Sequence, residues 1–218
     1  MNKRINILIF VICSFLLLGG CQSVNETEKK PSEMNEGDLP DVRALQDEFT
    51  RNFIQSTEEV EDGYYPFLSG TGQYKMLFPA EGLIDNRGYS VREKSYEAFL
   101  TAVINDNDTA SQITVDYYGT ETAEDSSTSL KHLEGRVGQE LDFTKTELET
   151  TIVHHAPISF EGNIFGIAAY VRNATGNGGI EIIYDTDCDV EQVDCTTFRQ
   201  EEEKKIVHWI SSIEFINE

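Results

Sequence analysis

An acidic loop near the C-terminus holds residue types that could bind a divalent cation. Its carboxylates are Asp185, Asp187, Asp189, Glu191 and Asp194. Calcium prefers about six to eight oxygen ligands, and the alternate spacing of the first three aspartates imitates the first half of an EF-hand loop. Val190 stands where that loop needs glycine, and Thr196 stands where it needs a bidentate glutamate. Two interpretations remain open: a Ca²⁺ site, or a solvated acidic loop without a metal.

The histidines show no spacing typical of a zinc site. They are His132, His154, His155 and His208. His154 and His155 are adjacent, so on a regular strand their side chains point to opposite faces and cannot bind one metal ion together. We predict no cofactor other than the possible Ca²⁺.

Two of the four cysteines remain for the folded region. Cys13 lies in an apolar N-terminal run, and Cys21 has a separate role discussed below. Cys188 and Cys195 lie close together in the chain, and outside the cytoplasm such cysteines usually pair. We therefore expect a disulfide between Cys188 and Cys195, since neither C-x-x-C nor a neighbouring histidine suggests a redox or metal pair.

Catalytic motifs are missing from the region after Cys21. It contains no G-x-S-x-G nucleophile elbow and no S-x-x-K sequence. Carboxylate pairs carry little information, because 39 acidic residues make accidental pairs inevitable. The glycine-rich segment 176–179 has no following lysine, so it predicts a hairpin turn and not a phosphate-binding loop.

The N-terminus has the parts of a bacterial secretion signal. A basic start with Lys3 and Arg4 precedes an apolar run from Ile5 to Leu18, which is shorter than the roughly 20 residues that cross a bilayer. The run ends in Gly19, Gly20 and Cys21.

The sequence Leu18-Gly19-Gly20-Cys21 resembles the processing site of bacterial lipoproteins. The resemblance implies cleavage between Gly20 and Cys21 and a diacylglyceryl group, with palmitate-type chains, on the Cys21 thiol. Two acyl chains anchor a protein stably to a membrane. The chain is therefore expected on the extracytoplasmic face of the cell membrane, bound through its lipid. As a whole it is also similar to small uncharacterised lipoproteins of Bacillus-type bacteria.

The charge of the chain limits its partners. The formal net charge is −22, and removal of residues 1–20 takes away two cations and no acid, which leaves −24. Nucleic acid is excluded as a partner, because its recognition needs clustered Lys and Arg. Anionic lipid surfaces also repel such a protein, so lipid on Cys21 must provide the membrane contact.

Three regions follow from composition: a signal peptide over 1–20, a lipidated flexible tether over 21–39, and one α+β domain over 40–218. From Pro40 the apolar spacing of Val42, Leu45, Phe49 and Phe53 predicts a helix. Strands are predicted at 64–68, 73–78 and 89–93, and a hairpin is predicted from 96–104 and 112–118.

The second half of the chain continues this alternation. A helix is predicted around 130–141, strands at 147–154, 158–161, 164–172 and 180–184, a helix at 197–209 and a last strand at 212–216. Strands joined by tight turns indicate an antiparallel sheet flanked by helices, an α/β/α sandwich. Aromatic residues in the strands, such as Phe67 and Tyr117, are expected in the core or in a ligand-binding wall.

The run Gly72-Gln73-Tyr74-Lys75-Met76-Leu77-Phe78-Pro79, followed by Gly82, resembles the early hairpin of the PsbP/Mog1-like α/β/α sandwich proteins. The ending, a helix through Trp209 and then Ser211 to Phe215, is similar to theirs. The resemblance implies a binding or assembly factor and supplies no catalytic residues.

The sequence therefore predicts a membrane-anchored extracytoplasmic lipoprotein that binds an unknown protein or small ligand. It favours a non-enzymatic binding or assembly module. An envelope hydrolase with a site assembled from distant residues, and a Ca²⁺ or small-ligand receptor centred on the acidic loop, are the alternatives.

Overall fold

The structure, a computed structural model, describes residues 29–105, 109–120, 126–188 and 194–217. Two helices of more than two turns occur in this part of the chain, α3 (Ser127–Val137) and α4 (Cys195–Ser211). The shorter helical turns are η1 (Pro31–Glu33), η2 (Glu36–Asp38), α2 (Arg43–Gln46) and η3 (Thr50–Asn52). No helix among the described residues is long and apolar enough to span a bilayer.

A small antiparallel sheet forms the first layer. Its strands are β1 (Tyr64–Leu68), β2 (Tyr74–Pro79) and β11 (Glu214–Phe215), in the order β1-β2-β11. The sheet joins the beginning of the domain to its end, because β2 pairs with β1 on one side and with the C-terminal β11 on the other.

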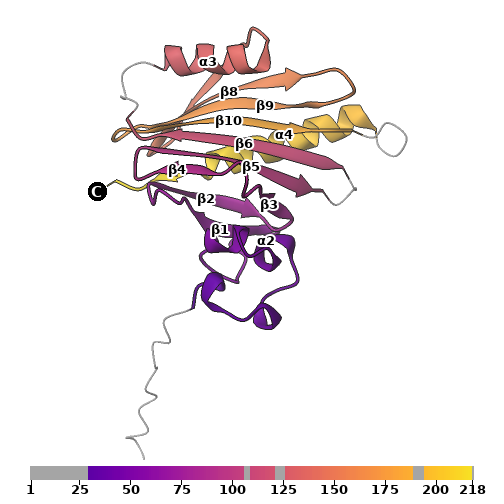
Figure 1. The fold of residues 1–218 in the computed structure, drawn as a ribbon. Coiled ribbons are helices and arrows are strands. Elements are labelled where there is room, and N and C mark those ends of the chain that lie inside the picture. Colours follow the sequence, from indigo (N-terminus) through magenta and orange to yellow (C-terminus); the bar gives the residue numbers. More distant parts are fainter. Residues whose placement is uncertain (1–28, 106–108, 121–125, 189–193, 218) are drawn as a thin grey trace, which may run out of the picture.

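A large antiparallel sheet forms the centre of the molecule (Figure 1). Its main path runs β3-β5-β6-β10-β9-β8-β7, and β4 pairs with β5 beside this path. The strands are β3 (Gly82–Ile84), β4 (Ser90–Arg92), β5 (Tyr96–Ile104), β6 (Ala110–Tyr118), β7 (Thr144–Glu147), β8 (Thr151–Ser159), β9 (Phe165–Asn173) and β10 (Gly179–Thr186).

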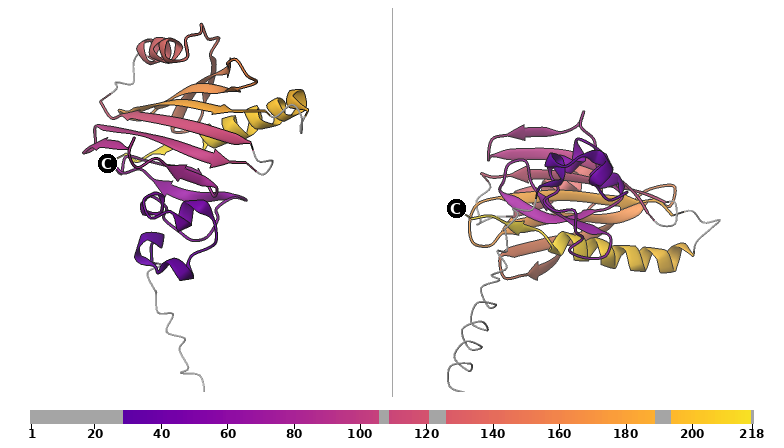
Figure 2. Two further views of the ribbon diagram at one scale, coloured as in Figure 1. Left: turned by 45° about the vertical axis from the view of Figure 1, so that its right-hand side comes forward. Right: turned by 90° about the horizontal axis from the view of Figure 1, so that it is seen from below.

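The two faces of the large sheet are covered differently. The small sheet and α4 pack on one face, and the main core there includes Phe67, Val115, Ile182 and Trp209. Helix α3 lies on the opposite face and packs through Val137 (Figure 2). Strand β9 lies between α3 and α4, which explains why nearly all of its residues are buried on both faces of the sheet.

The predicted fold class is confirmed: the domain is α+β, with a large antiparallel sheet and few helices packed on it. The hairpin β5–β6 pairs residue for residue over Tyr96–Ile104 and Ala110–Tyr118. Two strands predicted over 147–161 are in fact the single strand β8, which continues through Pro157. Pro157 is tolerated because the short edge strand β7 does not pair with that part of β8.

The helix predicted from Pro40 onward is wrong in extent. Only α2 and η3 form there, and the helix stops at Asp47, whose backbone is extended and whose Oδ1 accepts a hydrogen bond from the Thr50 N–H (2.7 Å). The apolar side chains of the predicted stripe still reach the core, since Leu45 and Phe53 are buried and Val42 and Phe49 pack against it while partly buried. Apolar spacing therefore indicated which side chains face the core, but it indicated their secondary structure incorrectly.

The predicted tether also extends too far toward the domain. Residues 31–38 contain the turns η1 and η2, Pro31 is buried, and Leu39 belongs to the main core. The folded region thus begins before Pro40. Residues 21–28, with Cys21, lie outside the described residues.

The disulfide between Cys188 and Cys195 is present, with a Cα–Cα distance of 5.8 Å. It connects the end of β10 to the first residue of α4, and it packs beside Phe165 and Phe198. The bond therefore holds the N-terminal end of α4 against the hairpin of β8 and β9.

We expect reduction of this disulfide to lower the free energy of unfolding by about 2–3 kcal/mol, because the reduced chain gains loop entropy when unfolded. Urea denaturation with and without reductant measures the change. The double variant Cys188→Ser/Cys195→Ser serves as the matched control, since reductant should not alter its stability. Two reactive thiols in the unreduced, denatured protein would contradict the pairing.

Candidate functional site: a charged cluster between helix α3 and the sheet

A row of polar residues crosses the α3 face of the large sheet. Glu181 on β10 lies directly opposite Asp116 on β6 and Tyr170 on β9. The row continues through His154 on β8 and Lys145 on β7, because each residue is the register partner of the one before it. Side chains of residues in register point to the same face of a sheet, so these five groups share one surface.

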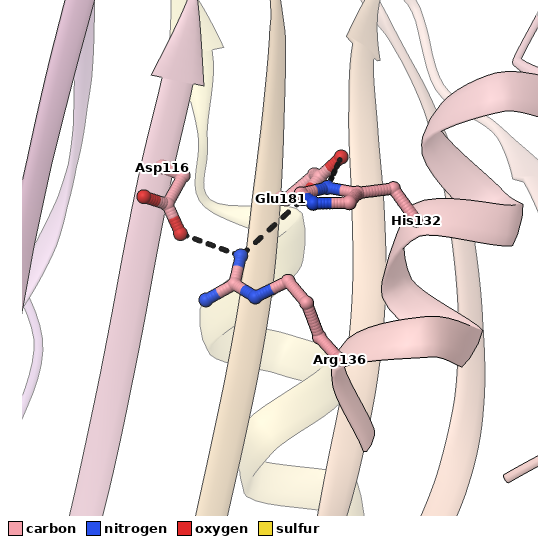
Figure 3. Close-up of polar contacts among 4 residues, drawn as sticks. All are labelled: Asp116, His132, Arg136 and Glu181. Carbon is pink, nitrogen blue, oxygen red and sulfur yellow. Dashed lines mark hydrogen bonds and ion pairs between the residues drawn. The ribbon is translucent and has the colours of Figure 1, made fainter. Parts of the chain in front are cut away.

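Helix α3 places two cationic side chains above the acidic end of this row (Figure 3). His132 and Arg136 are four residues apart and therefore share one side of the helix. The Arg136 Nη1 group donates to Asp116 Oδ2 (2.6 Å) and to Glu181 Oε2 (3.3 Å). His132 Nδ1 lies 2.8 Å from Glu181 Oε2 and 3.0 Å from Oε1. We call these four residues the α3 cluster.

Burial differs sharply within the α3 cluster. The side chain of Glu181 is 2% exposed, whereas that of His132 is 54% exposed. Burial raises the pKa of Glu181, and this effect outweighs the opposing hydrogen bonds and charges of His132 and Arg136. Burial alone would lower the pKa of Arg136, but Asp116 and then Glu181 raise it, so the guanidinium stays charged.

The pKa shift of Glu181 predicts a pH dependence of stability. Its pKa lies above the ordinary value of 4.5 in the folded protein, so just above pH 4.5 the folded state binds more protons than the unfolded state. The contribution of Glu181 to stability is therefore full below that pH and falls as the pH rises through the raised pKa. We expect wild type to lose stability relative to Glu181→Gln over this window, measured by urea denaturation between about pH 4 and pH 8.

Glu147 supplies the control for this prediction. It is exposed, and its hydrogen bond with Lys145 lowers its pKa. The contribution of Glu147 to stability is thus present above pH 4.5 and falls as the pH decreases. Wild type should therefore gain stability relative to Glu147→Gln as the pH rises, which is the opposite of the change expected for Glu181→Gln. A stability of wild type that rises relative to that of Glu181→Gln as the pH increases over this window would contradict the assignment.

Two tyrosines extend the α3 cluster along the sheet. Tyr96 and Tyr118 are register partners with ring centroids 5.5 Å apart, and Arg92 lies over the Tyr96 ring at 5.6 Å. Burial, followed by the charge of Asp116, raises the pKa of Tyr118 to about 12. Both rings therefore stay neutral at physiological pH. The arrangement joins charged groups from α3, β6 and β10, so its clearest chemical effect is to fix the helix on the sheet.

A second buried carboxylate lies on the other face of the sheet. Glu97 on β5 is 0% exposed and accepts hydrogen bonds from the Gly70 N–H (2.9 Å), the Tyr89 hydroxyl (2.9 Å) and the Thr71 hydroxyl (3.3 Å). Burial, then Glu97, raises the pKa of Tyr89, so its hydroxyl stays protonated and donates. Glu97 thus connects the β1–β2 turn to the large sheet.

Comparison with known proteins assigns this chain to a family. A family model described as "Putative lipoprotein YvcA", and related to Mog1p, matches residues 40–214. The chain belongs to this family. It is similar to the "Putative lipoprotein YvcA" of Bacillus subtilis (strain 168), with 29% identity over 236 aligned positions that cover 95% of this chain and 96% of the relative. The resemblances to Bacillus-type lipoproteins and to Mog1-like proteins are thereby confirmed.

In this member of the YvcA family, the acidic loop is only partly described, because Asp189 and Glu191 lie outside the described residues. Asp187 Oδ1 accepts from the Ala110 N–H (2.8 Å). Asp194 is the N-cap of α4 and accepts from the Thr196 N–H (3.1 Å) and the Thr197 hydroxyl (2.9 Å). Asp185 is half-buried on β10, and burial raises its pKa.

These contacts give the visible carboxylates structural roles. In the ranges that the structure describes, no three His, Cys, Asp or Glu side chains are grouped as a metal site. Calcium binding by the 185–194 loop stays a prediction. The candidate cleavage and lipidation residues, Gly20 and Cys21, also lie outside the described part of the chain.

The histidines and aromatic residues considered as ligands lie in separate parts of the structure. His132 belongs to the α3 cluster, and His208 on α4 contacts Glu61 (2.7 Å). Burial lowers the pKa of both His154 and His155. Phe67 and Tyr117 are 1% and 3% exposed, so they belong to the core, which was the first of the two roles predicted for them.

The described surface includes a hollow of about 690 Å³ lined by Phe160, Phe165, Arg199 and the disulfide. A largely apolar groove of about 530 Å³ lies on the small sheet.

Sequence reasoning did not single out Asp116, Arg136, Glu181 or Glu97. A signal for two of them was present: Glu181 interrupts the apolar strand Ile180–Tyr184, and Glu97 lies between Tyr96 and Ala98 in another buried strand. A charged residue within an apolar strand of this kind needs a partner when it is buried. The identity of the partners required the register of the sheet.

Proposed function

We propose that this chain is a lipoprotein held on the extracytoplasmic face of the cell membrane through lipid on Cys21, with a folded domain that acts as a binding or assembly module. The observation that carries the proposal is Cys21 directly after Gly19 and Gly20 and an apolar run, in a member of a lipoprotein family. Anchoring of this kind keeps the domain at the membrane without basic residues.

The disulfide provides independent support for the compartment. Disulfides persist outside the cytoplasm and are rare within it. Cys188 and Cys195 form a disulfide, and they lie far in the sequence from the N-terminal signal. The disulfide and the signal are thus two separate features consistent with export.

The binding role is supported by how the domain uses its buried charges. Glu181 is held by two cationic side chains, and Glu97 by backbone and hydroxyl donors. These contacts fix α3 and the small sheet on the large sheet. The buried charges thus have partners within the fold, which leaves the outer surface of the domain available to a partner.

Metabolic labelling tests the anchor. Cells that express wild type or Cys21→Ser are grown with an alkyne analogue of palmitate, fractionated, and treated with protease while intact. We expect label, membrane association and protease sensitivity for wild type, and loss of the label and of membrane association for Cys21→Ser. Equal labelling of both proteins, or protection of wild type inside intact cells, would refute the proposal.

A further inference from the structure

An apolar groove lies on the outer surface of the small sheet. Its floor includes Pro66 and Leu68 of β1 and Leu77 of β2, and Val60 forms part of its wall. Its volume of about 530 Å³ lies within the range of ligand-binding pockets. Val60 is 54% exposed, the largest exposure among the exposed large hydrophobic residues of the described chain. We call this feature the β1–β2 groove.

The backbone beneath the β1–β2 groove already has hydrogen-bond partners. The Pro66 carbonyl accepts from the Gln55 N–H (2.9 Å), and the Leu77 carbonyl accepts from the Trp209 indole (2.8 Å). The Leu77 N–H donates to the Ser212 hydroxyl (3.1 Å). A ligand therefore gains little from adding a strand here, and recognition must come from side-chain burial and from charge.

An acidic run continues from the groove. The lining residues Val60 and Glu61 belong to the exposed run Glu58-Glu59-Val60-Glu61-Asp62, so its other acids are their neighbours in sequence. Glu61 contacts His208, and Lys75, another lining residue, is paired with Glu214 (2.7 Å). The cations at the groove are thus already matched by carboxylates, whereas the run adds further negative charge in a chain of net charge −22.

We infer that the β1–β2 groove binds an extended peptide segment of a partner protein in which apolar and basic residues alternate. Apolar side chains would be buried on Leu68 and Leu77, and Lys or Arg side chains would meet the acidic run. An acyl chain would gain nothing from the acidic run, and an anionic peptide would be repelled by it. The inference deepens the binding role proposed above by naming the class of partner.

Peptide binding to the full chain, purified from membranes in detergent micelles, tests the inference. The probe is a fluorescent peptide of alternating lysine and leucine, followed by anisotropy at low and high salt. Two comparison peptides replace lysine by glutamate or leucine by serine. We expect the Lys-Leu peptide to bind most tightly, and high salt to weaken its binding because the charged groups are exposed.

Variants locate the binding. Val60→Asp should weaken binding of the Lys-Leu peptide by at least about tenfold, because it removes apolar contact area at an exposed position that does not support the fold. Glu58→Gln/Asp62→Asn should weaken it by about threefold. The matched controls are Ile104→Asp, at another exposed apolar residue, and Glu149→Gln, at another exposed acid, and both should bind as wild type.

Several results would overturn the inference. The first three are no binding of the Lys-Leu peptide, equal binding of the Glu-Leu peptide, and unchanged binding by Val60→Asp. The fourth is displacement of the peptide by a water-soluble short-chain fatty acid, which would indicate an acyl chain as the occupant. The anchor is read out separately by labelling of Cys21, so failure of the groove and failure of the proposed anchoring can be distinguished.

Discussion

Replacement of Glu97 by alanine should lower the free energy of unfolding by about 3–5 kcal/mol, because each buried donor left without an acceptor costs about 1–3 kcal/mol. The donors are the Gly70 N–H and the hydroxyls of Tyr89 and Thr71, all within 3.3 Å of the carboxylate. The loss would separate the β1–β2 turn from the large sheet. Urea denaturation at neutral pH measures the effect.

Two further variants provide a scale for the effect of Glu97→Ala on stability. Tyr89→Phe removes one donor together with its need for an acceptor, so it should cost only about 1 kcal/mol. Glu201→Ala, at an exposed acid on α4, should change stability by less than about 0.5 kcal/mol. If Glu97→Ala were no more harmful than Tyr89→Phe, water would be replacing the carboxylate, and Glu97 would not connect the two layers.

Gly70 shows how closely this site is fitted. A Cβ atom added to Gly70 would collide with the Tyr89 hydroxyl, so a larger residue here would displace that hydroxyl from its present position beside the carboxylate. The turn signal Ser69-Gly70-Thr71-Gly72 was visible in the sequence. Its additional role as a carboxylate-binding loop was not, because Glu97 is distant in the chain.

The part of the fold that could be predicted depended on local information. The β5–β6 hairpin followed from alternation and a polar turn, and β1 and β2 followed from aromatic runs around Ser69–Gly72. The helix predicted after Pro40 was wrong because the apolar residues there are buried by irregular structure that contacts other elements. For example, the Ala44 N–H donates a hydrogen bond to the Ala80 carbonyl (2.9 Å). Tertiary contacts of this kind override helical spacing.

The α3 cluster could not be predicted for a related reason. Asp116 and Glu181 become neighbours only because β10 pairs with β6, although β9 and β8 come between them in sequence. A shift of one residue in that register would turn Glu181 to the opposite face. Asp116 therefore carries no local signature, and the interruption of an apolar strand by Glu181 does not reveal its partners. The cations of α3 meet both carboxylates only after the sheet has formed.

Arg136 is the residue on which the α3 cluster depends most. Its guanidinium contacts both Asp116 and Glu181, and those side chains are 13% and 2% exposed. Arg136→Met keeps most of the apolar stem but leaves two poorly hydrated carboxylates side by side. We expect a loss of about 3 kcal/mol, near the lower end of the cost of breaking a buried ion pair, because Arg136 itself is 24% exposed.

The loss should depend on pH, because removal of the Arg136 cation changes the protonation equilibria of both acids. Without Arg136, the charge of Asp116 adds to the burial that already raises the pKa of Glu181, so Arg136→Met should be less harmful at low pH than at neutral pH. Lys145→Met is the matched control, since its ion pair with Glu147 joins side chains that are 50% and 67% exposed, and solvent screening leaves such a pair little effect on stability. Adding Glu181→Gln to Arg136→Met should recover part of the loss, because it removes the buried charge that Arg136 no longer neutralises. Additive losses in that double variant, or equal effects of Arg136→Met and Lys145→Met, would show that the cluster does not fix α3 on the sheet.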